Sequence, residues 1–155
     1  MAGWNGPVGP GLARRPSPTL VIMGAERDLG RLLRDMRPEL NPGRFVFATV
    51  TGAMPRGLLP VVTVAEAEGL TLVLAQEQAD AAGLEYHYVA GWITLRVRSA
   101  LDAVGLTAAV ASELARAGLS CNVVAAYHHD HLFVPYHRVT DALAVLRSFA
   151  ERGPG

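Results

Sequence analysis

The sequence lacks the features that mark several common classes of protein. Its single cysteine, Cys121, excludes an internal disulfide and a metal–thiolate cluster, and its apolar neighbours predict an inert thiol. No apolar run approaches the length of a membrane span. The 14 basic and 14 acidic residues cancel, so no broad field favours nucleic acid or an anionic membrane. We therefore expect a cytoplasmic protein without nucleic-acid or membrane partners.

The sequence also shows no arrangement of catalytic residues. Ser99, Ser112 and Ser120 lack the motif of an exposed nucleophile, and no glycine-rich phosphate loop is present. Glu66 and Glu68 are a possible acid–base pair, but nothing places a nucleophile near them, and a solvated turn is an equally good explanation. We expect no enzymatic activity and no cofactor.

A run of histidines, His128-His129-Asp130-His131, invites a metal-site interpretation. Side chains alternate in an extended segment, so His129 and His131 share one face while His128 and Asp130 share the other. Neither face offers more than two ligands, whereas zinc needs at least three from the protein. A metal would need a further ligand such as His87 or His137, and we expect no metal site.

The first 22 residues are rich in glycine and proline and are expected to form a disordered extension. Arg14-Arg15 precedes an apolar run at residues 20–23, but this run is too short for the core of an export signal. Met23 is an alternative start, and residues 1–22 are predicted to be dispensable.

The rest of the chain is organised around residues 92–135. Ile93, Leu95 and Val97 alternate with polar residues, which predicts a half-buried strand. The apolar period then changes to that of a helix, which Gly118 ends. The predicted order is a strand near 93–97, a helix at 106–117, strands at 123–127 and 131–134, and a helix at 139–149. This strand–helix–strand–strand–helix order is ferredoxin-like.

The first half reads as a reduced version of the second. Asp28 is the expected N-cap of a helix that Pro38 ends. Residues 61–68 give no clear pattern, although Ala65–Glu68 suggest a helical turn. The other predicted elements are strands at 44–51, 70–75 and 85–89, a loop at 52–60, and a short helix at 76–82 that Gly83 caps.

The second half lacks its last strand. A complete ferredoxin-like unit needs a fourth strand after its second helix, and the tail ending in Gly-Pro-Gly cannot supply one. Its sheet edge stays open unless the first half or another subunit covers it. We therefore expect two interlocked halves that do not fold separately.

The segment from Ser99 to Ala109, SALDAVGLTAA, resembles the first strand–helix junction of the ACT domain, and SCNVVAAYHHDHLFVP resembles small proteins with two tandem ACT units. These are related to the amino-acid-sensing units of aspartate kinases and cytosolic arginine sensors. The resemblance implies an α+β fold of two interlocked βαββαβ units. We assign residues 23–90 to a reduced ACT-like unit, 91–151 to an ACT domain and 152–155 to a tail.

The resemblance places a ligand at the Gly105 junction. Glycine lets a ligand approach the backbone, and the free N–H groups at a helix start can bind a carboxylate, although an ordinary helix start explains this glycine equally well. Asn122 is expected to orient the ligand or bond a turn, and Asp130 to meet its distal group, as an acidic residue does in the arginine-sensor relatives. The predicted ligand-binding residues are Val104, Gly105, Leu106, Thr107, Asn122, Tyr127 and Asp130.

We therefore expect a non-catalytic regulatory protein that senses an amino acid or similar small molecule between its two ACT units. The alternative is a protein-interaction module that uses an open sheet edge and has no ligand. A third, weaker interpretation is an enzyme or metal protein built on the histidine run. A homodimer or an unidentified protein partner is compatible with the first two.

Overall fold

The computed structural model describes residues 25–153, and the expectations for residues 1–22 lie outside this range. Its elements are α1 (Leu29–Asp35), β1 (Pro38–Leu40), β2 (Phe45–Val50), β3 (Val62–Ala65), β4 (Leu70–Ala75), α2 (Gln76–Ala81), β5 (Val89–Leu95), α3 (Leu106–Arg116), β6 (Asn122–Ala125), β7 (Asp130–Pro135), a 3₁₀ turn η1 (Tyr136–Arg138) and α4 (Val139–Arg152). The strands form one antiparallel sheet of order β3-β4-β2-β5-β7-β6, and β1 also pairs with β5.

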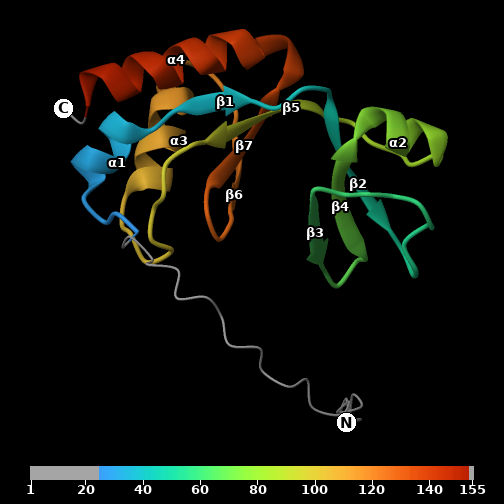
Figure 1. Ribbon diagram of the computed structural model, residues 1–155. Helices are drawn as coiled ribbons and strands as arrows, with labels where there is room; N and C mark the ends of the chain where they lie inside the picture. The colour runs from blue at the N-terminus through green and yellow to red at the C-terminus, as the bar shows by residue number, and fades with distance from the viewer. Residues whose placement is uncertain (1–24, 154–155) are drawn as a thin grey trace, which may run out of the picture.

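The second half has the ferredoxin-like order predicted for it. Helices α1, α3 and α4 cover one face of the sheet around β5, while α2 packs on β2 and β4 (Figure 1). The core between the sheet and α1, α3 and α4 contains Leu32 and Leu33 of α1 together with Leu114, Leu132 and Leu146, all at most 1% exposed. The α+β fold of ACT-type units is confirmed.

The missing fourth strand is supplied by the first half. Strand β1 pairs with β5 from Pro38↔Leu95 to Leu40↔Ile93, in the place where the last strand of the unit belongs. Helix α1, which precedes β1, packs against α3 and α4. The first half was expected to cover the open sheet edge of the second half. Strand β1 does so within one chain, which confirms this expectation.

Two local expectations were wrong. Residues 85–88 do not form a strand. This segment is attached to helix α2 by a side chain rather than to a neighbouring strand by its backbone, because the Tyr86 hydroxyl donates to Asp80 Oδ1 at 2.6 Å. The strand begins at Val89 and runs unbroken to Leu95, so one strand joins the two halves.

The second error concerns residues 61–68. A helical turn was expected at Ala65–Glu68, but Ala65 ends strand β3, which pairs with β4. Reciprocal backbone bonds between Glu66 and Gly69 close a hairpin around two residues. Gly69 has φ +155°, and an added Cβ would lie 2.6 Å from the carbonyl oxygen of Val50. Only glycine fits at position 69 of this hairpin. The sequence analysis interpreted the alternating alanine and glutamate residues as a helical turn and therefore missed the hairpin.

Candidate functional site

The predicted ligand junction lies where β5 leads into α3. Gly105 is the N-cap of α3, with φ +105° and no side-chain capping bond. Leu106 is 3% exposed and packs in the core, so only its backbone faces the junction. Val104 is 85% exposed and Thr107 is also exposed. The junction therefore offers the backbone N–H groups of a helix start beside one exposed apolar side chain.

The reason for glycine at position 105 differs from the one expected. A Cβ on Gly105 would lie 3.1 Å from Leu29 Cδ2, and positive φ disfavours every other residue type. Helix α1 thus occupies the space beside the glycine. The backbone conformation and the close contact with Leu29 account for Gly105 without a ligand, and its ligand-binding role stays a prediction.

Asp130 lies on the helix-covered face of the sheet. It pairs with Leu95 and Ala125, and it shares a face with Leu132, which belongs to the core beneath the helices. Asp130 is only 7% exposed. Burial raises the pKa of its carboxyl, opposed only by the charge of His129, and no hydrogen bond to a described residue lowers it. No buried side-chain oxygen of the described residues lacks a partner, so the Asp130 carboxyl oxygens reach the protein surface, where a ligand can meet them.

The structure does not bring all the predicted residues together. Asn122 pairs with Phe133 and faces the opposite side of the sheet from Asp130, nearer the other end of the strand. It lies close to the Tyr88 hydroxyl. Tyr127 is 75% exposed in the β6–β7 turn, at the same end of the molecule as the start of α3 (Figure 1). Asp130, Tyr127 and the Gly105 junction therefore gather at one end, and Asn122 does not.

The junction faces away from strands β2, β3 and β4 of the first unit. Helix α3 begins beside α1, while β2, β3 and β4 lie on the far side of β5 (Figure 1). Three large apolar side chains are strongly exposed at the junction end: Leu101, Val104 and Tyr127. Within one chain, strands β2, β3 and β4 do not form a wall of this site, whereas Leu29 of α1 packs against Gly105 and Arg27 pairs with Asp102.

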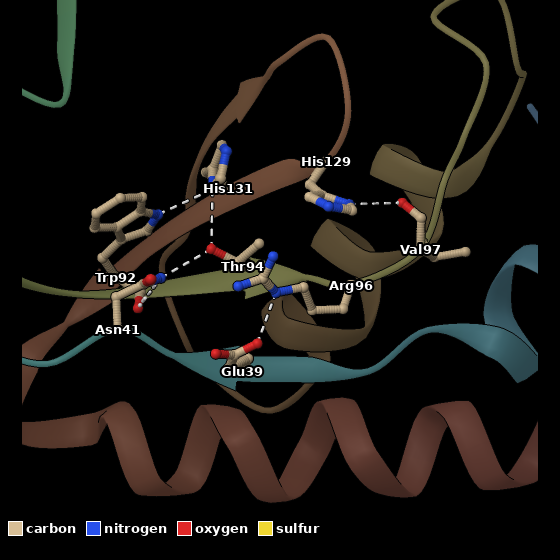
Figure 2. Close-up of polar contacts among 8 residues, drawn as sticks. All are labelled: Glu39, Asn41, Trp92, Thr94, Arg96, Val97, His129 and His131. Atoms are coloured by element: carbon tan, nitrogen blue, oxygen red, sulfur yellow. Dashed lines mark hydrogen bonds and ion pairs between the residues drawn. The ribbon is translucent and has the colours of Figure 1, made fainter. Parts of the chain in front are cut away.

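A polar network that sequence analysis missed lies on the opposite face of the sheet (Figure 2). The Trp92 indole Nε1–H donates to His131 Nδ1 at 3.0 Å, and Thr94 Oγ1 lies 3.1 Å from the same nitrogen. The Asn41 side chain donates to Thr94 Oγ1 at 2.8 Å. The alternation of Trp92 and Thr94 places them on one face, and that is the only sequence signal for the network.

The remaining titratable groups give no catalytic arrangement. Burial raises the pKa of the Cys121 thiol to about 11, as befits an unreactive cysteine. Within residues 25–153, no group of three or more His, Cys, Asp or Glu side chains is placed to hold a metal ion. No helix in the described part of the chain is long and apolar enough to cross a membrane.

This chain belongs to the ACT-domain family, as a protein with two ACT units in tandem. Two ACT-domain family models match residues 24–91 and residues 88–148. ACT domains are regulatory modules that bind small molecules, so the family defines a regulatory, ligand-binding class of protein. No curated protein matched the sequence.

Solved structures agree with this assignment. A Vibrio cholerae protein of unknown function, described as a possible transport protein, is 50% identical, with a TM-score of 0.72 over 79% of this chain and 95% of that one. A protein from Agrobacterium tumefaciens is 20% identical, with a TM-score of 0.60 over 74% and 89% of the two chains. The regulatory subunit of Thermus thermophilus aspartate kinase shares the fold, with 10% identity and a TM-score of 0.57 over 72% and 95%.

Proposed function

We propose that this protein is a non-catalytic cytoplasmic sensor that binds an amino acid at the end of the second unit where α3 begins. The Asp130 carboxyl carries the proposal: the residue is only 7% exposed, yet its oxygens are not sealed in the core and are accessible to a ligand. It lies at the same end of the sheet as the α3 N-terminus, where free N–H groups and the helix dipole attract a carboxylate. A ligand with a carboxylate and a cationic group complements both features.

The ligand site is proposed to close against another ACT unit. The junction faces away from strands β2, β3 and β4 of its own chain, and Leu101, Val104 and Tyr127 stay exposed around it. A second copy of the chain supplies the facing unit, which covers these apolar side chains and shields the ligand from water. The protein is then a homodimer with its ligand at an interface between ACT units.

A thermal-shift screen against the twenty amino acids tests the proposal. A ligand at about 100 times its dissociation constant stabilises the fold by about 2.7 kcal/mol. Failure of every amino acid to raise the Tm of the full chain contradicts amino-acid binding. Analytical ultracentrifugation with and without the stabilising ligand then tests the proposed dimer.

Asp130→Asn separates a binding role from a structural one. Because burial raises the folded-state pKa of Asp130, ionisation favours the unfolded chain, and stability falls as pH rises through the folded pKa. The variant removes that penalty, so without ligand it should be more stable than wild type at pH 7. It should also lose the thermal shift given by ligand. Asp35→Asn, on the exposed surface of α1, is the matched control and should keep the shift.

The open sheet edges favour a second function. Strand β3 forms one edge of the sheet; Val64 within it and Val61 just before it are 48% and 40% exposed. An edge with few charges can pair with a strand of another protein. Val64→Lys should abolish such pairing while leaving amino-acid shifts unchanged, which distinguishes the interaction module from the sensor.

A further inference from the structure

The network on the helix-free face of the sheet fixes the proton of one histidine. Trp92 Nε1 can only donate, so His131 Nδ1, 3.0 Å away, must be an unprotonated acceptor. The proton of the neutral imidazole is therefore on Nε2. Thr94 Oγ1, which accepts from Asn41, has its own hydroxyl proton available for the same Nδ1. When His131 is neutral, the single lone pair of Nδ1 accepts from Trp92, and the Thr94 hydroxyl can at most share it.

Protonation of His131 breaks this match. The second proton of an imidazolium is on Nδ1, and it would point at the Trp92 N–H across a 3.0 Å contact. Two donors that face each other repel, and the Trp92 hydrogen bond is lost with the Nδ1 lone pair. The Trp92–His131 contact is therefore compatible only with neutral His131, whereas a protonated Nδ1 would donate to Thr94 Oγ1 instead.

The charged groups around His131 also favour its neutral form. His129 in the turn before β7 and Arg96, which directly follows β5, both disfavour a positive charge on the ring, while Glu39 on β1 is paired with Arg96. Strand β6 pairs Val124 with His131 and brings no ionisable group to this position. Burial and these two cations lower the pKa of His131.

Trp92 stands where the chain passes from one unit to the other. On one edge, β5 pairs first with β2, at Val89 and Ala90, and then with β1, from Ile93 onward. Asn41 fills the gap: its backbone N–H donates to the Trp92 carbonyl at 2.8 Å, and its side chain donates to the same oxygen at 3.2 Å. The Trp92 ring also packs on Phe45 of β2, with ring centroids 5.1 Å apart.

We propose that His131 is a proton-controlled latch on the crossing between the two units. Neutral His131 holds Trp92 and, through Thr94, Asn41, so that β1 and β2 keep their places along β5. Protonation releases the indole and loosens the Asn41 turn. Because protons favour the released form, the latch is closed above about pH 6.5, the ordinary pKa of histidine, and opens as pH falls below it.

The test uses the full chain with Trp4→Phe, which leaves Trp92 as the only tryptophan. ¹⁵N NMR of the imidazole should show the proton on Nε2 at neutral pH and a titration midpoint below about 6.5. Trp92 emission should shift over the same pH range. Exchange of the Asn41 amide, corrected for its intrinsic pH dependence, should accelerate over that range while amides within α4 stay protected.

Two variants complete the test. His131→Gln keeps an acceptor for Trp92 but cannot titrate, so the emission change should disappear. His137→Gln changes an exposed histidine elsewhere and should keep it. The latch is refuted by a proton on Nδ1 at neutral pH, by a midpoint at or above 6.5, or by Trp92 emission and Asn41 exchange that ignore His131 protonation. The wild-type imidazole signals decide the question even if His131→Gln fails to fold.

Discussion

Replacing Gly91 by alanine tests how α4 packs on the central strand. A Cβ on Gly91 would lie 2.6 Å from Val139 Cγ2 and 3.1 Å from Val139 Cβ, closer than packed carbons can approach. The added methyl group must push β5 and the first turn of α4 apart, and overpacking of this kind costs about 1–3 kcal/mol. Each kcal/mol lowers the Tm of a domain of this size by roughly 2–4 °C.

A double-mutant cycle identifies Val139 as the cause. Val139→Ala alone removes two partly buried carbons and should cost about 1 kcal/mol, because each fully buried CH₂ contributes about 0.8 kcal/mol. Since it also makes room for the new methyl group, the double variant should be at least about 1 kcal/mol more stable than additivity predicts. Free energies of unfolding from urea titrations give all four corners of the cycle.

Gly30→Ala is the matched control. Gly30 lies within α1, its φ is not positive, and its Cβ would meet only the mobile guanidinium of Arg34 and the Asp28 side chain at 3.3 Å. Alanine favours a helix over glycine by about 0.5–1 kcal/mol, which offsets the crowding of the capping Asp28 Oδ1, so this variant should lose less stability than Gly91→Ala. A Gly91→Ala protein as stable as wild type, or a cycle without coupling, would refute the packing of α4 described here.

Three further predictions concern the ends of helices and the union of the halves. Asp28→Ala removes the α1 cap, a 2.8 Å bond to the Arg31 N–H, and should cost about 0.5–2 kcal/mol in urea denaturation; an unchanged midpoint would exclude the cap. A fragment of residues 90–155 should not melt cooperatively, because it lacks three fully buried side chains of α1, each worth about 1.5–3 kcal/mol: Leu32, Leu33 and Met36. Cooperative melting of the fragment would show that the halves fold independently. Gly105→Ala should destabilise the ligand-free protein by about 1–3 kcal/mol because of its positive φ, and wild-type stability would contradict that conformation.

Periodic segments could be predicted from sequence, whereas short strands could not. The apolar spacing of residues 106–117 gave helix α3 to within one residue of each end, and Asp28 was recognised as a cap. Strand β1 has only three residues, too few to show any period, and its partner β5 lies more than fifty residues away. The need for a covering strand was predictable from the truncated second half, but its identity was not.

In the candidate site, too, features that depend on spacing within one strand were predictable, whereas those that depend on pairing between strands were not. Alternation along β7 correctly separated Asp130 from His131 and His129. Asn122 was grouped with Asp130 because both flank one hairpin, yet the register of β6 on β7 places Asn122 opposite Phe133 and on the other face. Register depends on pairing between strands, which one-dimensional spacing does not contain. The Trp92–His131 contact escaped prediction for the same reason.

The turn at Asn41, where the chain passes between the units, distinguishes the proposed His131 latch from the proposed ligand site at Asp130. Because β1 completes the second unit while β2 begins the first, the chain must change units within the few residues between Leu40 and Phe45. Strand β5 crosses the same boundary unbroken, so the Asn41 turn and β5 are two connections between the units. A hydrogen bond on this turn acts at the boundary of both units, whereas one within a single unit acts on that unit. Asn41, bonded through Thr94 to His131, is such a contact, whereas Asp130 lies within the second unit and binds without requiring the crossing to move.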